Sequence, residues 1–144
     1  MNIFRAENPQ VILLIKEYFV DDPGVDTDQV AAELMAFMAS SPDKVLVILI
    51  TDDEGGKVDI KGFLIGWIPA ERNYLMLHQA KWIDLKFPEK FPHAANSVFS
   101  RAEAFAEFNE LKSIRAETSR SPESLLRKYG FIEFAKILVY NLGD

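Results

Sequence analysis

One apolar run constrains the fold of this chain more than any other feature. Residues Val45 to Ile50 are all aliphatic, and most of them are β-branched. β-Branched residues favour strands, and a strand without a polar face is typical of a sheet that is covered on both sides. The sequence therefore predicts a strand here that is buried on both of its faces.

Two amphipathic segments precede this strand. Asn8 is a suitable helix cap and Pro9 a suitable first helical residue, and apolar residues then recur at helical spacing up to Val20. Asp26, with Gln29 three residues later, resembles a capping box at the start of a second helix. Both segments are therefore predicted to be helices.

The rest of the chain mixes strands and helices. The expected elements are a strand over 2–6, helices over 9–20 and 26–39, strands over 45–50, 58–68 and 74–84, a helix over 93–108, a strand over 111–118, a helix over 122–129 and a strand over 131–142. The order β-α-α-β-β-β-α-β-α-β predicts an α/β (α+β) fold with one mixed, mainly antiparallel sheet. The helix over 93–108 supplies the crossover that a parallel pair of strands requires. No repeat or linker divides the chain, so a single domain over 1–144 is expected.

Composition argues against several classes of protein. At 144 residues, with 49% hydrophobic and 26% charged residues, the chain has the balance of a globular domain. It contains no cysteine, which excludes disulfides and a cysteine nucleophile, and its two separated histidines do not predict a metal site. No apolar run approaches the roughly 18 residues of a membrane helix, and the first residues do not form a secretory signal. The cytoplasm is the expected location.

Charge narrows the choice of partners. The net charge is −6 and the sequence has no basic stripe, so nucleic-acid binding is not expected. An acidic surface would attract cationic partners such as amines or polyamines, or it would serve solubility alone.

A well-specified helix is predicted near the end of the chain. Ser121 is a suitable N-cap, Pro122 suits the first helical position, and Gly130 follows the last turn. The helix ends in the sequence Arg-Lys-Tyr-Gly-Phe. This ending and the order of the elements resemble the GNAT superfamily of acyl-CoA-dependent N-acyltransferases, and the resemblance covers residues 2–142.

The resemblance has consequences for fold and function. It implies that the parallel strands over 74–84 and 111–118 splay apart at their adjacent ends. It also implies acetyl-CoA as co-substrate, and transfer of an acetyl group to a primary amine of a small molecule or protein. The alternative is a catalytically inactive GNAT-fold binding or assembly module, because a fold does not fix a function.

The loop before the helix over 93–108 is a candidate anion site. This helix has no Ser, Thr, Asp or Asn at its expected start, so no side chain caps its first amides. Free amides at a helix N-terminus bind anions such as pyrophosphate, and Lys86 and Lys90 add positive charge nearby. We expect the amides of Ala94 to Asn96 to face an open cleft. The alternative is an ordinary connecting loop with two solvated lysines.

The GNAT pattern Gln/Arg-x-x-Gly-x-Gly/Ala, whose amides bind the CoA pyrophosphate, matches Lys90 to Ala95. His93 replaces its central glycine, where a side chain would hinder the approach of the pyrophosphate. Ser119 corresponds to an asparagine that the family often has at the entrance of the last helix. The residues that the resemblance assigns to the co-substrate are Ile83, Asp84, Leu85, Lys90, His93, Ala94, Ala95, Asn96 and Ser119.

Two residues are candidates for acid–base catalysis. The family's tyrosine, which protonates the leaving thiolate, is replaced by Leu126, and Tyr129 is the candidate substitute. His78 lies on the strand over 74–84, where the family often places a general base, and strand alternation predicts it on the same face as Ala80 and Trp82. The alternative is that Tyr129 and His78 only contribute packing.

The last twelve residues after Gly130 predict a single closing strand, where family members often have two antiparallel strands. One strand would leave an open edge, which a second copy of the chain could cover in a homodimer.

Overall fold

The computed structural model describes residues 1–19, 24–54, 56–117, 132–134 and 137–142. The elements are β1 (Asn2–Arg5), α1 (Val11–Ile15), η1 (Lys16–Tyr18), α2 (Thr27–Ser40), η2 (Pro42–Lys44), β2 (Val45–Glu54), β3 (Lys57–Trp67), β4 (Tyr74–Trp82), α3 (Phe87–Lys90), α4 (Ala94–Phe108), β5 (Ser113–Glu117), β6 (Ile132–Phe134) and β7 (Ile137–Asn141). The predicted helix over 122–129 lies outside the described residues. No helix within the described ranges is both long and apolar enough to cross a membrane.

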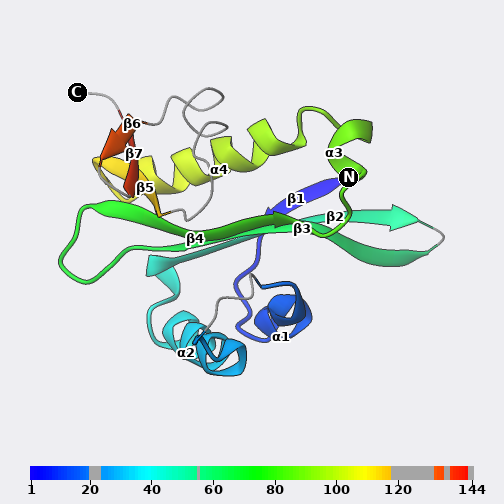
Figure 1. Ribbon diagram of the computed structural model, residues 1–144, viewed down its shortest axis with the longest axis horizontal. Helices are drawn as coiled ribbons and strands as arrows, with labels where there is room; N and C mark the ends of the chain where they lie inside the picture. Colours follow the sequence, from blue (N-terminus) through cyan, green and yellow to red (C-terminus); the bar gives the residue numbers. More distant parts are fainter. Residues whose placement is uncertain (20–23, 55, 118–131, 135–136, 143–144) are drawn as a thin grey trace.

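The described strands form one sheet in the order β1-β2-β3-β4-β5-β7-β6. β4 and β5 pair in parallel, and the other neighbouring strands pair antiparallel. The helix α4 forms the crossover between β4 and β5 (Figure 1). The predicted mixed sheet with this parallel pair is confirmed.

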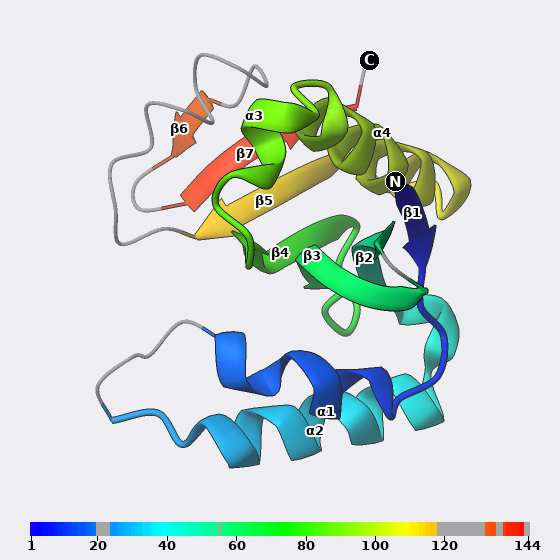
Figure 2. The same cartoon turned by 90° about the vertical axis from the view of Figure 1, so that its right-hand side faces the viewer.

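Helices cover both faces of the sheet. The helix α4 lies against one face, and α1 and α2 lie against the other (Figure 1, Figure 2). In β2, Leu46, Ile48 and Ile50 pack in the core on the α4 side, and the alternate residues pack in the core on the side of α1 and α2. All residues from Val45 to Ile50 are buried. The prediction of a strand covered on both faces is therefore confirmed.

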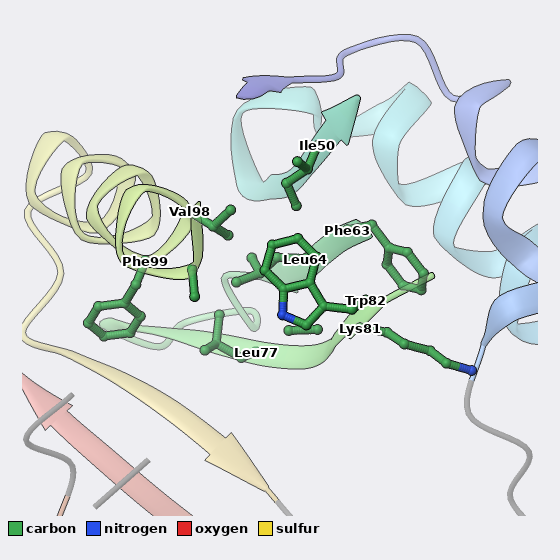
Figure 3. A pocket seen from close by; sticks show the side chains of 10 residues that line it. Ile50, Phe63, Leu64, Leu77, Lys81, Trp82, Val98 and Phe99 are labelled. Carbon is green, nitrogen blue, oxygen red and sulfur yellow. The ribbon is translucent and has the colours of Figure 1, made fainter. Parts of the chain in front are cut away.

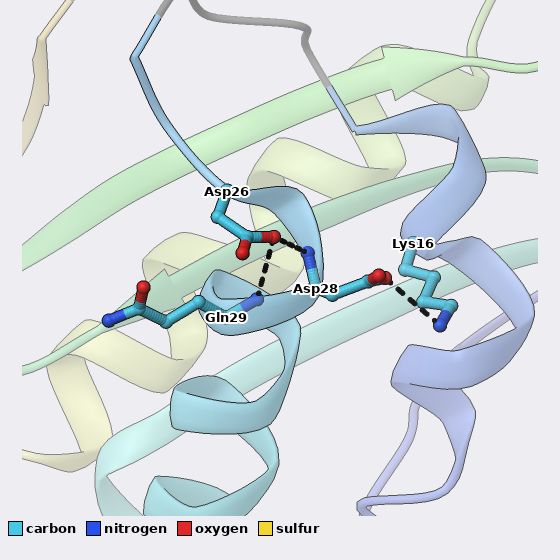
Figure 4. A network of polar contacts seen from close by, with 4 residues as sticks. All are labelled: Lys16, Asp26, Asp28 and Gln29. Atoms are coloured by element: carbon cyan, nitrogen blue, oxygen red, sulfur yellow. Dashed lines mark hydrogen bonds and ion pairs between the residues drawn. The ribbon is translucent and has the colours of Figure 1, made fainter.

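The helix α2 begins after Asp26 as predicted, whereas α1 begins at Val11, two residues later than the predicted start at Pro9. The Asn8 side chain accepts a hydrogen bond from the Gln10 amide (3.0 Å), and α1 then continues into the 3₁₀ turn η1. The Asp26 carboxylate accepts from the amides of Asp28 (3.0 Å) and Gln29 (3.4 Å) at the start of α2 (Figure 4). Only half of the predicted capping box forms, because the Gln29 side chain donates to Glu33 instead.

The C-terminal segment differs from the prediction of one strand over 131–142. It forms two strands, β6 and β7, which pair antiparallel, and β7 lies between β5 and β6. The reason is that this arrangement gives β7 hydrogen-bonding partners on both sides, whereas one strand would leave its outer row of backbone groups without them. The edge of the described sheet on this side is therefore β6.

The loop predicted between β4 and the following helix contains a short helix, α3. Pro88 lies in its first turn, where a missing amide proton costs nothing, and Phe87 is buried beneath it. The Lys86 amide donates to the Asp84 side chain (3.0 Å) just before this turn. The local signal for α3 is present in the sequence, although the helix is too short to show an apolar period.

The cap of α2 can be tested by mutation. Replacing Asp26 by alanine removes the acceptor of two amides, and we expect the free energy of unfolding to fall by about 0.5–2 kcal/mol, measured by urea denaturation. Asp26→Asn keeps an acceptor oxygen and should retain most of the stability. Asp28→Ala removes only an exposed ion pair with Lys16 (3.2 Å) and should cost no more than about 1 kcal/mol. Equal stability of Asp26→Ala and the parent protein would contradict the capping role.

Candidate active site

The strands β4 and β5 are paired over only a short length. Their parallel register runs from Tyr74 opposite Ser113 to Leu77 opposite Ala116. Beyond Leu77, β4 continues to Trp82. In this part, β4 pairs with β3 and with no other strand of the described residues. The two strands thus diverge at the ends predicted to splay, as Figure 2 shows.

A β-bulge marks the point of divergence. On β3, Gly66 lies opposite Leu77 and Ile65 lies opposite Gln79, so His78 has no opposite residue. The bulge needs a close approach of the two strands, because a Cβ atom on Gly66 would lie 2.9 Å from the Met76 carbonyl oxygen. The glycine at this position therefore allows β4 to bulge where it leaves β5.

The bulge corrects the predicted orientation of His78. The His78 ring lies 4.9 Å from the Trp67 ring, and Trp67 packs against the core on the side of α1 and α2. Trp82 and Ala80 instead lie on the α4 side of the sheet. Strict alternation fails here because the extra residue in β4 shifts the following side chains to the opposite faces.

On the α4 side, the diverging part of β4 lines a cavity of about 150 Å³. Leu77 and Trp82 come from β4, and Val98 and Phe99 come from α4 (Figure 3). The lining is mostly apolar, and the Lys81 side chain extends away from it (Figure 3). The cavity can hold a small apolar group beside the bulge.

An aromatic cluster lies beside this cavity. The Trp82 ring lies 5.8 Å from the Phe87 ring, which in turn lies 4.7 Å from the Phe91 ring. Phe87 belongs to α3, so this short helix packs next to the start of α4. The cluster positions the loop that was predicted to bind an anion.

The start of α4 has no side-chain cap, as predicted. The Ala94 amide was expected to be free, but it donates to the Phe91 carbonyl (3.1 Å), because α3 ends one turn before α4 begins. The amides of Ala95 and Asn96 have no acceptor among the described residues. His93 is exposed with φ −91°, so it needs no left-handed backbone. Two of the three predicted donors are thus available.

The other predicted co-substrate residues on this loop differ in whether the fold already uses their polar groups. The amides of Ile83 and Asp84 both donate to the Lys61 carbonyl (2.8 and 3.2 Å), and the Asp84 carboxylate pairs with the Lys61 ammonium (3.5 Å). Leu85 is 78% exposed. Lys90 is exposed at the end of α3, with its ammonium 5.5 Å from the Phe91 ring. The Ile83 and Asp84 amides are therefore already used by the fold.

His78 has the electrostatic character of a weak base that is neutral at pH 7. Burial of its ring lowers the pKa of His78 below the ordinary value of 6.5. Part of the side chain is exposed to solvent, and the Trp67 ring covers it on the other side. A neutral imidazole can accept a proton from an ammonium group.

Three residues named from the sequence lie outside the described residues: Ser119, Leu126 and Tyr129. The described residues contain no group of three histidine, aspartate or glutamate side chains that could hold a metal ion. Sequence analysis did not identify Trp82 or Gly66 as parts of the site. A glycine inside a strand pattern is a known sign of a bulge or a close backbone approach, so Gly66 carried a signal that could have been used.

The chain was compared with protein families, with curated protein sequences and with solved structures. No protein-family model and no curated protein sequence matches the chain. Solved structures do match. They include a GNAT-family acetyltransferase from Staphylococcus aureus Mu50, with a TM-score of 0.68, 14% identity and 99% coverage of each chain. Another is a GNAT-family acetyltransferase from Brucella melitensis in complex with acetyl-CoA, with a TM-score of 0.65, 14% identity and coverage of 99% of this chain and 88% of that one.

A third is the aminoglycoside 6'-N-acetyltransferase from Enterococcus faecium, with a TM-score of 0.67, 11% identity and coverage of 100% and 98%. The similarity of these structures establishes the fold, and sequence identities of 11–14% do not establish a substrate. The chain has the fold of the GNAT acetyltransferases, and the resemblance inferred from its sequence is confirmed at that level.

The lowered pKa of His78 can be tested by titration. We expect the midpoint of the His78 ring, followed by proton NMR, to lie below 6.5, because burial disfavours the charged ring. Trp67→Leu removes the aromatic cover and should move the midpoint up toward the ordinary value. His78→Gln assigns the signal by removing it, with the ring of His93 as the remaining resonance. A midpoint at or above 6.5 in the parent protein would refute the desolvated environment.

Proposed function

We propose that the protein is an acyl-CoA-dependent N-acyltransferase that moves an acetyl group from acetyl-CoA to a primary amine. The observation that carries this proposal is the bulge at His78. There β4 leaves β5, an apolar cavity lies on one side of the sheet, and an imidazole lies on the other. Such an arrangement suits a reaction in which two substrates meet through an opening between strands.

The start of α4 is the proposed site for the pyrophosphate of acetyl-CoA. The Ala95 and Asn96 amides point out of the first turn without acceptors among the described residues, and Lys86 and Lys90 lie on the preceding loop and on α3. Amides at a helix N-terminus and nearby ammonium groups favour phosphate oxygens. The cavity of about 150 Å³ is too small for the whole co-substrate, so we assign to it only the acyl end and the adjoining chain.

The proposed chemistry is direct attack. His78 takes a proton from the incoming ammonium, and the neutral nitrogen attacks the thioester carbonyl carbon. A backbone amide of the bulged segment polarises the carbonyl oxygen while the C–N bond forms and the C–S bond breaks. The leaving thiolate takes a proton, for which Tyr129 is the proposed donor, and the nitrogen loses its second proton to solvent as the amide forms. Solvent then returns a proton to Tyr129.

The rival function is a GNAT-fold module that binds without transferring. It is favoured by Leu126, which occupies the position of the family's acid, and loss of a positioned acid typically costs about 10²–10⁴-fold in rate. A calorimetric titration with acetyl-CoA, followed by an assay for free thiol with a panel of amines, separates the two. Binding without thiol release above the uncatalysed rate would support the module.

Two further expectations from the sequence stay predictions. The predicted homodimer through the C-terminal edge of the sheet would use β6, because β7 is paired on both sides. Sedimentation analysis tests it. The cytoplasm remains the expected location on the grounds of composition alone.

Trp82 provides a direct test of co-substrate binding. Because Trp82 lines the cavity and Trp67 lies on the other face, acetyl-CoA should change the emission of Trp82 only. We expect a saturable fluorescence change in Trp67→Phe and none in Trp82→Phe. Binding to each variant is checked independently by calorimetry. A change that survives in Trp82→Phe and is lost in Trp67→Phe would place the ligand on the wrong face.

Binding should also stabilise the fold. At a hundredfold excess over its dissociation constant, acetyl-CoA should add about 2.7 kcal/mol, seen as a higher melting temperature. The pair Lys86→Gln and Lys90→Gln should together weaken binding by roughly 3–30-fold, since each exposed charge near a helix N-terminus contributes about 0.3–1 kcal/mol. Lys57→Gln, at the distant β2–β3 hairpin, is the matched control and should bind as the parent does. Equal affinity of all three proteins would argue against the α4 site.

A further inference from the structure

A cationic side chain lies on the sheet where β4 and β5 part. Arg115 is on β5 opposite Met76, and its guanidinium carbon lies 4.0 Å from the centre of the Tyr74 ring. This distance is that of a guanidinium stacked on an aromatic face. Tyr74 thus holds Arg115 flat against the sheet.

Arg115 is on the same face of the sheet as His78. Its neighbours on β5, Ile114 and Ala116, pack in the core beneath α4. Because side chains alternate along a strand, Arg115 lies on the opposite face, the one covered elsewhere by α1 and α2. His78 is on that face too, through its contact with Trp67. The two side chains therefore share one side of the opening.

The charge of Arg115 is not compensated by the described part of the protein. Its Nε is buried and has no hydrogen-bond partner, and the ion pairs among the described residues do not include it. A buried donor without a partner is costly and is rarely kept without a reason. The Arg115 Nε, which has no acceptor among the described residues, points to a ligand that brings an anion.

We propose that the acceptor of this enzyme is an amine that also carries a carboxylate, and that Arg115 binds this carboxylate. A guanidinium recognises a carboxylate with two parallel hydrogen bonds, and stacking on Tyr74 presets its orientation. The guanidinium lies on the ring of Tyr74, which is four residues before His78 on β4, or about 13 Å at the usual strand rise. An acceptor that reaches both groups would therefore carry its amine several bonds away from its carboxylate.

This inference rests on the proposed acyl transfer, but its test does not depend on turnover. The probes are matched pairs that differ only by a carboxylate: phenylalanine against phenethylamine, leucine against isopentylamine, and lysine against cadaverine. Each is titrated by calorimetry into the protein saturated with CoA, where no acetyl group is present, and into the protein without CoA. We expect the carboxylate member to bind about 10–100-fold more tightly in at least one pair.

Two variants and a control assign the effect to Arg115. In Arg115→Met the preference for the carboxylate member should fall to about onefold, whereas Arg115→Lys should keep part of it, since a lysine offers charge without the paired donors. Arg101→Met removes an exposed arginine on α4 and should keep the full preference. Melting temperatures check that each variant folds. If Arg115→Met does not fold, the Arg115→Lys comparison decides alone.

The outcomes separate the two proposals. If neither acetyl-CoA nor CoA gives a heat of binding, but the carboxylate preference is present and depends on Arg115, the proposed acyl transfer is contradicted and the proposed carboxylate site is supported. Binding of acetyl-CoA with equal affinity for both members of every pair would keep the transfer and overturn the carboxylate site. A preference that persists unchanged in Arg115→Met would also overturn it.

Discussion

The site depends on the limited pairing between β4 and β5. Among the described residues, four of each strand are in register, from Tyr74 and Ser113 to Leu77 and Ala116. A parallel pair that continued would close the sheet with backbone hydrogen bonds and leave no opening. The bulge at His78 ends the pairing at a defined place, and Gly66 lets the bulge form because it has no side chain to collide with the Met76 carbonyl.

The two faces of the sheet differ chemically where β4 and β5 part. On the α4 side, Leu77 and Trp82 line an apolar cavity close to the uncapped start of the helix. On the side of α1 and α2 lie His78, whose pKa is lowered by burial, and Arg115, whose Nε has no acceptor among the described residues. In the proposed function, the thioester and diphosphate of acetyl-CoA bind at the first face, and an amine with an acid group binds at the second.

The sequence predicted the architecture more completely than the site. Asp26, the apolar run from Val45 to Ile50 and the absence of a cap before α4 are local signals, and each is confirmed. The predicted face of His78 was wrong, since one extra residue in a strand reverses the alternation that follows it. The Ala94 amide was predicted to be free, but α3 brings the Phe91 carbonyl within hydrogen-bonding distance.

The sequence by itself determined most of the helices and strands, because those signals lie within a few residues of one another along the chain. It did not predict α3 or the division of the last strand into β6 and β7. It also determined that a parallel crossover exists, since a helix separates β4 from β5. Only the tertiary structure decided which side chains meet. Arg115 lies on Tyr74 and His78 lies on Trp67 because strand register and a single bulge align positions that are distant in the chain. Register depends on which faces of neighbouring strands are buried together, and a single bulge changes it, so alternation along one strand was not enough to place these side chains.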